Sequence, residues 1–72
     1  MNKEIQVLNL VKRVFPNTTV RKSDREYIFT FENYNTAWPF DLIDSTPIGR
    51  LPMVAFYIAY DIFDLKAGGE IK

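Results

Sequence analysis

The 72-residue sequence contains no cysteine and no histidine. Without cysteine the chain forms no disulfide and no thiolate metal site, and without histidine it lacks the commonest transition-metal ligand and the usual general base. Glycine is scarce, and Gly49, Gly68 and Gly69 do not form the glycine-rich loop that binds phosphates. We therefore expect no catalytic constellation, no metal site and no cofactor, and we predict that the protein is not an enzyme.

Long apolar stretches are also missing. Residues 51–60 are weakly charged, but Asp61 follows directly, and the stretch is about half the length that spans a bilayer. The N-terminal residues lack the unbroken apolar stretch of a secretory signal. We therefore expect no membrane association and a cytoplasmic location.

The residues that are present form an ordinary globular mixture, with 47% hydrophobic, 15% aromatic and 25% charged residues. Residues 1–72 are predicted to be one domain, because the chain is shorter than a typical domain of about 100 to 150 residues. A chain this short buries only about 60% of the surface that its unfolded form exposes. Dense apolar packing, or a partner, must therefore hold it together.

Three segments in the first part of the chain have a clear periodicity. Residues 3–15 are predicted to be a helix, because their apolar side chains fall within an arc of about 160° and Pro16 disfavours helical geometry at the preceding residue. Residues 18–22 and 26–32 are rich in β-branched or alternating apolar residues, and turn-forming side chains separate them. They are interpreted as two strands of an antiparallel hairpin.

The second half of the chain is expected to contribute a third strand and a second helix. Residues 37–43 are interpreted as a strand at the sheet edge or as an extended segment, because Pro39 cannot donate to a β-ladder. Residues 51–66 are predicted to be a helix that ends at Gly68 and Gly69, with residues 69–72 frayed. The expected fold class is α+β, a single-layer antiparallel sheet of two or three strands packed against two helices.

The second helix is apolar over an arc of about 200°, wider than the roughly 100° stripe that a surface helix needs. One interpretation is that this helix is the central core element; the other is that part of it is covered by another protein, most simply a second copy in a homodimer. The candidate partner-binding residues are those outside the apolar arc, together with two possible anchors near the third strand: Met53, Tyr57, Tyr60, Asp61, Asp64, Trp38 and Phe40.

Charge is distributed unevenly although the chain is neutral as a whole. Six basic and two acidic residues precede Glu26, whereas three basic and seven acidic residues lie from Glu26 onward. A compact basic patch able to meet phosphates would form if the basic residues of the first helix and hairpin lie together: Lys12, Arg13, Arg21, Lys22 and Arg25. The pI of about 6.1 weighs against this nucleic-acid hypothesis.

Three hypotheses for function follow from these observations. The leading one is a non-enzymatic protein-binding module, an inhibitor or adaptor, that self-associates through the second helix. The second is nucleic-acid binding through the basic patch. The third is a binder of a nucleotide or metabolite in a pocket between the sheet and the second helix, lined by aromatic residues and closed by Arg50 or Arg25.

Overall fold

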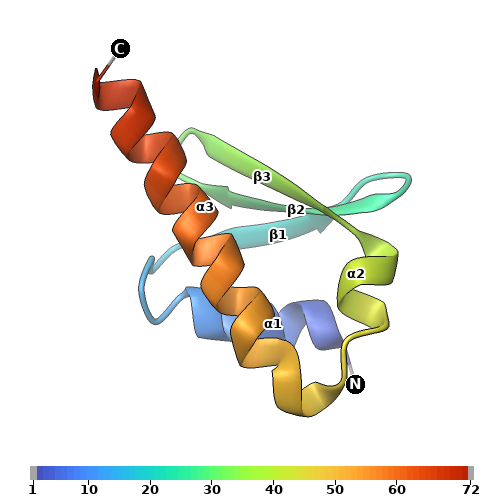
Figure 1. Cartoon of the computed structure of the whole chain (residues 1–72). Coiled ribbons are helices and arrows are strands. Elements are labelled where there is room, and N and C mark those ends of the chain that lie inside the picture. Colours follow the sequence, from blue (N-terminus) through green and yellow to red (C-terminus); the bar gives the residue numbers. More distant parts are fainter. Residues whose placement is uncertain (1, 72) are drawn as a thin grey trace.

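The computed structural model describes the backbone of residues 2–71 and the side chains of residues 2–68. The elements in chain order are α1 (Lys3–Val11), β1 (Thr19–Lys22), β2 (Glu26–Phe31), β3 (Tyr34–Pro39), α2 (Phe40–Asp44), the 3₁₀ turn η1 (Ile48–Arg50) and α3 (Leu51–Ile71). The strands form one antiparallel sheet in the order β1-β2-β3 (Figure 1). This confirms the expected α+β class with a single antiparallel sheet against helices.

The hairpin of β1 and β2 has the register that its turn predicts. Thr19 pairs with Thr30 and Lys22 with Tyr27, and the Ser23 side chain accepts a hydrogen bond from the Glu26 amide at 3.1 Å. The alternation along β2 turns Tyr27 and Phe29 toward the helices, where both are buried. One face of the sheet therefore supplies the floor of the core.

The core lies between this sheet face and the two longer helices. α1 and α3 pack against each other, and α3 runs across the sheet with its C-terminal turns extending past it (Figure 1). The side chains with at most 2% exposure come from every layer: Val7, Val11, Thr18, Phe29, Ile43, Leu51, Ile58 and Ile62. Residues far apart in the sequence thus share one apolar interior.

The third strand lies earlier than predicted, since it spans Tyr34–Pro39 and residues 40–44 form α2. The prediction of a strand over residues 37–43 is therefore wrong in its second half. The turn after β2 is at Glu32 and Asn33, with a positive φ of 54° at Glu32, so β3 begins at once. β3 ends at Pro39, which has no N–H for the ladder, and the Phe40 amide instead donates to the Arg25 carbonyl at 3.0 Å.

Both helix ends also differ from their predicted positions. α1 ends at Val11 rather than at residue 15, because the chain tightens into turns before Pro16: the amide of Val14 bonds to the carbonyl of Val11 at 3.0 Å, three residues back. α3 continues through Gly68 and Gly69 to Ile71, so the predicted end at these glycines is wrong. Lys72, the last residue of the segment predicted to fray, lies outside the described residues.

Candidate functional site

α3 has an inner face that is buried and an outer face that is not. Leu51, Ile58 and Ile62 are at most 1% exposed. On the outer face, five large side chains are each more than half exposed, at 52% to 64%; we call them the aromatic face: Met53, Phe56, Tyr57, Tyr60 and Phe63. The wide apolar arc of this helix is therefore divided between a core and an unpartnered surface.

The rings of the aromatic face pack on one another rather than on the body of the protein. The ring of Phe56 lies 6.3 Å from that of Tyr60, one turn along the helix, and 6.4 Å from that of Tyr57. Such tilted ring pairs are favourable but leave the outer side of each ring in water. The result is a contiguous apolar surface that the chain does not cover itself.

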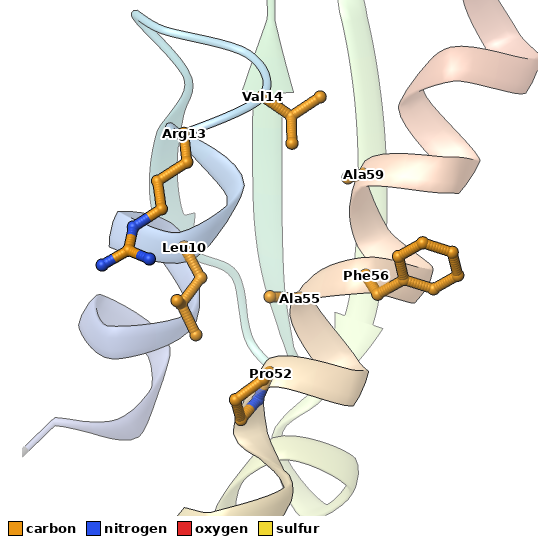
Figure 2. Close-up of a pocket in the computed structure, with 7 residues that line it drawn as sticks. All are labelled: Leu10, Arg13, Val14, Pro52, Ala55, Phe56 and Ala59. Carbon is orange, nitrogen blue, oxygen red and sulfur yellow. The ribbon is translucent and has the colours of Figure 1, made fainter.

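An apolar groove runs along one side of the aromatic face, between α3 and the end of α1. Figure 2 shows Leu10 and Val14 on one wall and Phe56 on the other, with the small side chains of Ala55 and Ala59 on α3 between them; the guanidinium of Arg13 points away from α3. The hollows here have volumes of about 220 and 170 Å³ and share Val14, Phe56 and Ala59. Val14 itself is 63% exposed, so the groove continues the apolar surface of α3.

The structure places Met53, Tyr57, Tyr60 and Asp64 as exposed residues of α3, but it turns Asp61 elsewhere. The Asp61 carboxylate accepts a hydrogen bond from the Thr36 hydroxyl on β3. That hydroxyl in turn accepts one from the Trp38 indole N–H at 2.8 Å, and Thr36 is only 5% exposed. Asp61 therefore fastens α3 to the sheet and does not belong to the aromatic face.

Trp38 and Phe40, the two candidate anchors, are both half-buried and pack against the core of their own chain. The Phe40 ring lies edge-on to Tyr27, with 4.6 Å between ring centroids. Neither is grouped with the aromatic face by the contacts that it makes. They contribute first to the packing of β3 and α2.

The five residues of the candidate basic patch are not brought together. Lys22 Nζ lies 3.8 Å from Glu4 Oε2 in the first turn of α1, whereas Lys12 and Arg13 follow the last turn, about 12 Å away at 1.5 Å per residue. Arg21 alternates with Lys22 along β1 and so takes the opposite sheet face, and Arg25 lies in the hairpin turn. The positive charge is spread over two ends and two faces of the domain.

The pocket that the third hypothesis requires is filled by core side chains. The space between the sheet and α3 contains Phe29, Ile58 and Ile62, each fully buried. Arg25 lines a different hollow, beside Pro39 and Phe40 at the tip of the hairpin. The aromatic residues on the inner face of the sheet are thus used for packing.

A polar cluster joins the N-terminus of α1 to the sheet and to α2, and the sequence gave no sign of it. The Tyr27 hydroxyl donates to Asp44 Oδ1 at 2.8 Å, and Lys3 Nζ donates to the carbonyls of Asp44 and Thr46 at 2.9 and 2.8 Å. Burial raises the pKa of Tyr27 to about 12, with further contributions from the hydrogen bond to Asp44 and the charge of Glu4. The cluster comes from four separate segments, so no spacing motif marks it.

Comparison with protein-family models, curated proteins and solved structures finds no match in any of the three. Across the described residues, every helix falls short of the length and apolarity needed to cross a bilayer. The functional argument therefore depends on the surface of the molecule, and the aromatic face with its groove is the part of that surface that most needs a physical explanation.

Proposed function

We propose that this chain is a small non-enzymatic protein-binding module that acts as a homodimer, with the aromatic face of α3 as the interface. One observation carries the proposal: Met53, Phe56, Tyr57, Tyr60 and Phe63 are all more than half exposed on one side of one helix. Tyr, Phe and Met are the residue types enriched in protein interfaces, where they supply contact area at modest entropic cost.

The exposed area matches what an interface requires. A fully buried aromatic side chain removes about 150 to 250 Å² from water, so the aromatic face and Val14 together leave roughly 600 to 700 Å² exposed. The largest apolar patch on a typical monomer is about 300 to 600 Å². A standard interface buries about 800 Å² per partner, which the aromatic face and its groove approach.

A second copy is the occupant that this surface fits best. The aromatic face is uncharged, and the chain has a formal net charge of zero, so two copies approach without long-range repulsion. A twofold axis brings the same apolar surface of both copies together, which covers both at once. Binding of this kind also stabilises a 72-residue fold by mass action.

Sedimentation equilibrium of the purified chain tests the proposal. We expect a mass of twice 8.4 kDa that falls to one chain in Phe56→Glu, because the new carboxylate would have to be buried against apolar side chains. Leu42→Glu is the matched control, since Leu42 is 43% exposed on α2 and away from the interface; it should remain a dimer. A wild-type chain that stays a monomer at every concentration would refute the proposal.

A further inference from the structure

We infer that the two α3 helices of the homodimer lie antiparallel, with Tyr60 close to the twofold axis and Tyr57 of each copy hydrogen-bonded to Asp64 of the other. This inference rests on the proposed function, since it describes how the second copy lies on the aromatic face. It follows from the spacing of the exposed residues along α3 and from the difference between the two flanks of that spacing.

The most exposed residues of α3 form a seam suited to one partner helix. Met53, Phe56, Tyr60, Phe63 and Ala67 are separated by alternating steps of three and four residues, which is the spacing of the apolar positions in a coiled coil. Residues with this spacing lie along one narrow stripe of a helix. The aromatic face is therefore shaped to meet a helix that runs along it, and α3 of a second copy is such a helix.

The two flanks of the seam differ in chemistry. The groove flank has Pro52, Ala59 and Lys66 at seven-residue spacing, and these residues line the hollows next to Val14 and Phe15. The opposite flank has Tyr57 and Asp64, also seven residues apart, which do not line these hollows in the described part of the chain. One flank is thus mainly apolar and the other polar.

The orientation decides which flanks meet. In a parallel pair, the groove flank of each helix faces the polar flank of the other, which would press the Asp64 carboxylate against Ala59 and the apolar groove without a partner. In an antiparallel pair, like flanks meet. Exposed Val14 then lies on the same side as Val14 of the second copy, and the Tyr57 hydroxyl lies beside the Asp64 carboxylate of the second copy, to which it donates.

Packing along the seam favours the same orientation. A parallel pair places each seam residue beside its own copy, so that Ala67 meets Ala67 and leaves a gap, while Tyr60 meets Tyr60. In the antiparallel pair Tyr60 lies beside Phe63, and the large Phe56 lies beside the small Ala67. Large beside small fills space more evenly, and opposed helix dipoles add a small favourable contribution.

Disulfide trapping tests the orientation cleanly, because the chain has no cysteine of its own. Under mild oxidation, Tyr60→Cys is expected to form a covalent dimer, since the two copies of this residue are offset by only about 4.5 Å along the helices. Met53→Cys is expected not to do so, because its copies lie about 25 Å apart in the antiparallel pair. A mixture of Phe56→Cys and Ala67→Cys should form the mixed disulfide.

The outcomes separate this inference from the proposed function. If Met53→Cys becomes covalently linked as readily as Tyr60→Cys, the pair is parallel and the inference is wrong while the homodimer stands. A dimer in which Tyr60→Cys does not cross-link also overturns the inference. A wild-type chain that is monomeric refutes both proposals.

A double-mutant cycle tests the hydrogen bond across the interface. Tyr57→Phe and Asp64→Ala are each expected to weaken dimerisation about 10-fold, and the double variant no further, because either change removes the same pair of contacts. Glu32→Ala is the control, since Glu32 pairs only with Lys66 of its own chain, at 3.8 Å. Additive losses in the double variant would show that Tyr57 and Asp64 do not interact.

Discussion

At the scale of single residues, Tyr27 is the group whose environment departs most clearly from water. It is 5% exposed and hydrogen-bonded to Asp44, and its pKa is raised from about 10 to about 12. In the unfolded chain the same phenol ionises near pH 10. Because the folded pKa is the higher one, Tyr27 contributes its full stability below pH 10 and loses it as the pH rises through 12.

We therefore predict that the free energy of unfolding falls between pH 9 and pH 12, and that Tyr27→Phe falls less steeply over this range because it cannot ionise. Urea denaturation at several pH values measures both curves. Tyr57→Phe is the matched control, since Tyr57 is 54% exposed; under dissociating conditions it should follow the wild-type pH dependence. A Tyr27→Phe curve parallel to that of the wild type would contradict the assignment.

Asp61 and Asp64 show how much a residue's role depends on contacts outside its own segment. They lie three residues apart on one helix, and the sequence assigned both to a partner surface. Thr36 on β3 takes Asp61 out of that surface by donating to its carboxylate, whereas Asp64 remains exposed. No periodicity within residues 51–66 distinguishes the two, because the distinction is made by a strand that is 25 residues away.

At the scale of elements, α3 was predictable as a helix, but its inner and outer faces were not. The sequence placed Phe56 and Phe63 within the same apolar arc as Ile58 and Ile62. The structure buries the two isoleucines and leaves the two phenylalanines at 64% and 60% exposure. Small Ala55 and Ala59 are buried where α3 approaches α1, a close approach that a pattern of apolar residues does not reveal.

Adjacent residues on α3 give a direct test of this division. We predict that Ile62→Ala lowers the stability of the monomer by about 2 to 5 kcal/mol, because it leaves a cavity in a site with no exposure. Phe63→Ala should change monomer stability by less than about 1 kcal/mol, since its ring is mostly in water before and after folding. Urea denaturation in the Phe56→Glu background keeps both variants monomeric. Equal losses would mean that Phe63 is part of the core.

The strands and helix ends show where local signals compete. The hairpin of β1 and β2 was predictable, because alternation and turn residues agree there. Pro39 was correctly expected to disturb β3, but it ends that strand and the chain then turns into α2, whereas the prediction continued the strand to residue 43. Beyond residue 67, two glycines indicated a helix end, yet the backbone stays helical to Ile71. Single breakers thus marked disturbances without fixing their outcome.

At the scale of the whole molecule, surplus apolar surface was predictable from the sequence, whereas the positions of charges were not. The apolar excess is a property of composition and length, so it appears in any fold of these 72 residues. The basic patch depended on where β1 lies relative to α1. Lys22 pairs with Glu4 at the start of that helix, which separates it from Lys12 and Arg13 at the other end.

The whole-molecule prediction concerns the coupling of folding to association. If the second copy covers the aromatic face, unfolding of the dimer releases two chains, so the midpoint temperature depends on protein concentration. For a chain of this size, a tenfold rise in concentration should raise Tm by about 3 to 5 °C. Phe56→Glu should unfold at a lower Tm that does not change with concentration, because its monomers are already separate. Differential scanning calorimetry over a hundredfold concentration range measures this dependence, and Leu42→Glu should retain it. A wild-type Tm that does not change with concentration would mean that the fold is stable with its aromatic face in water.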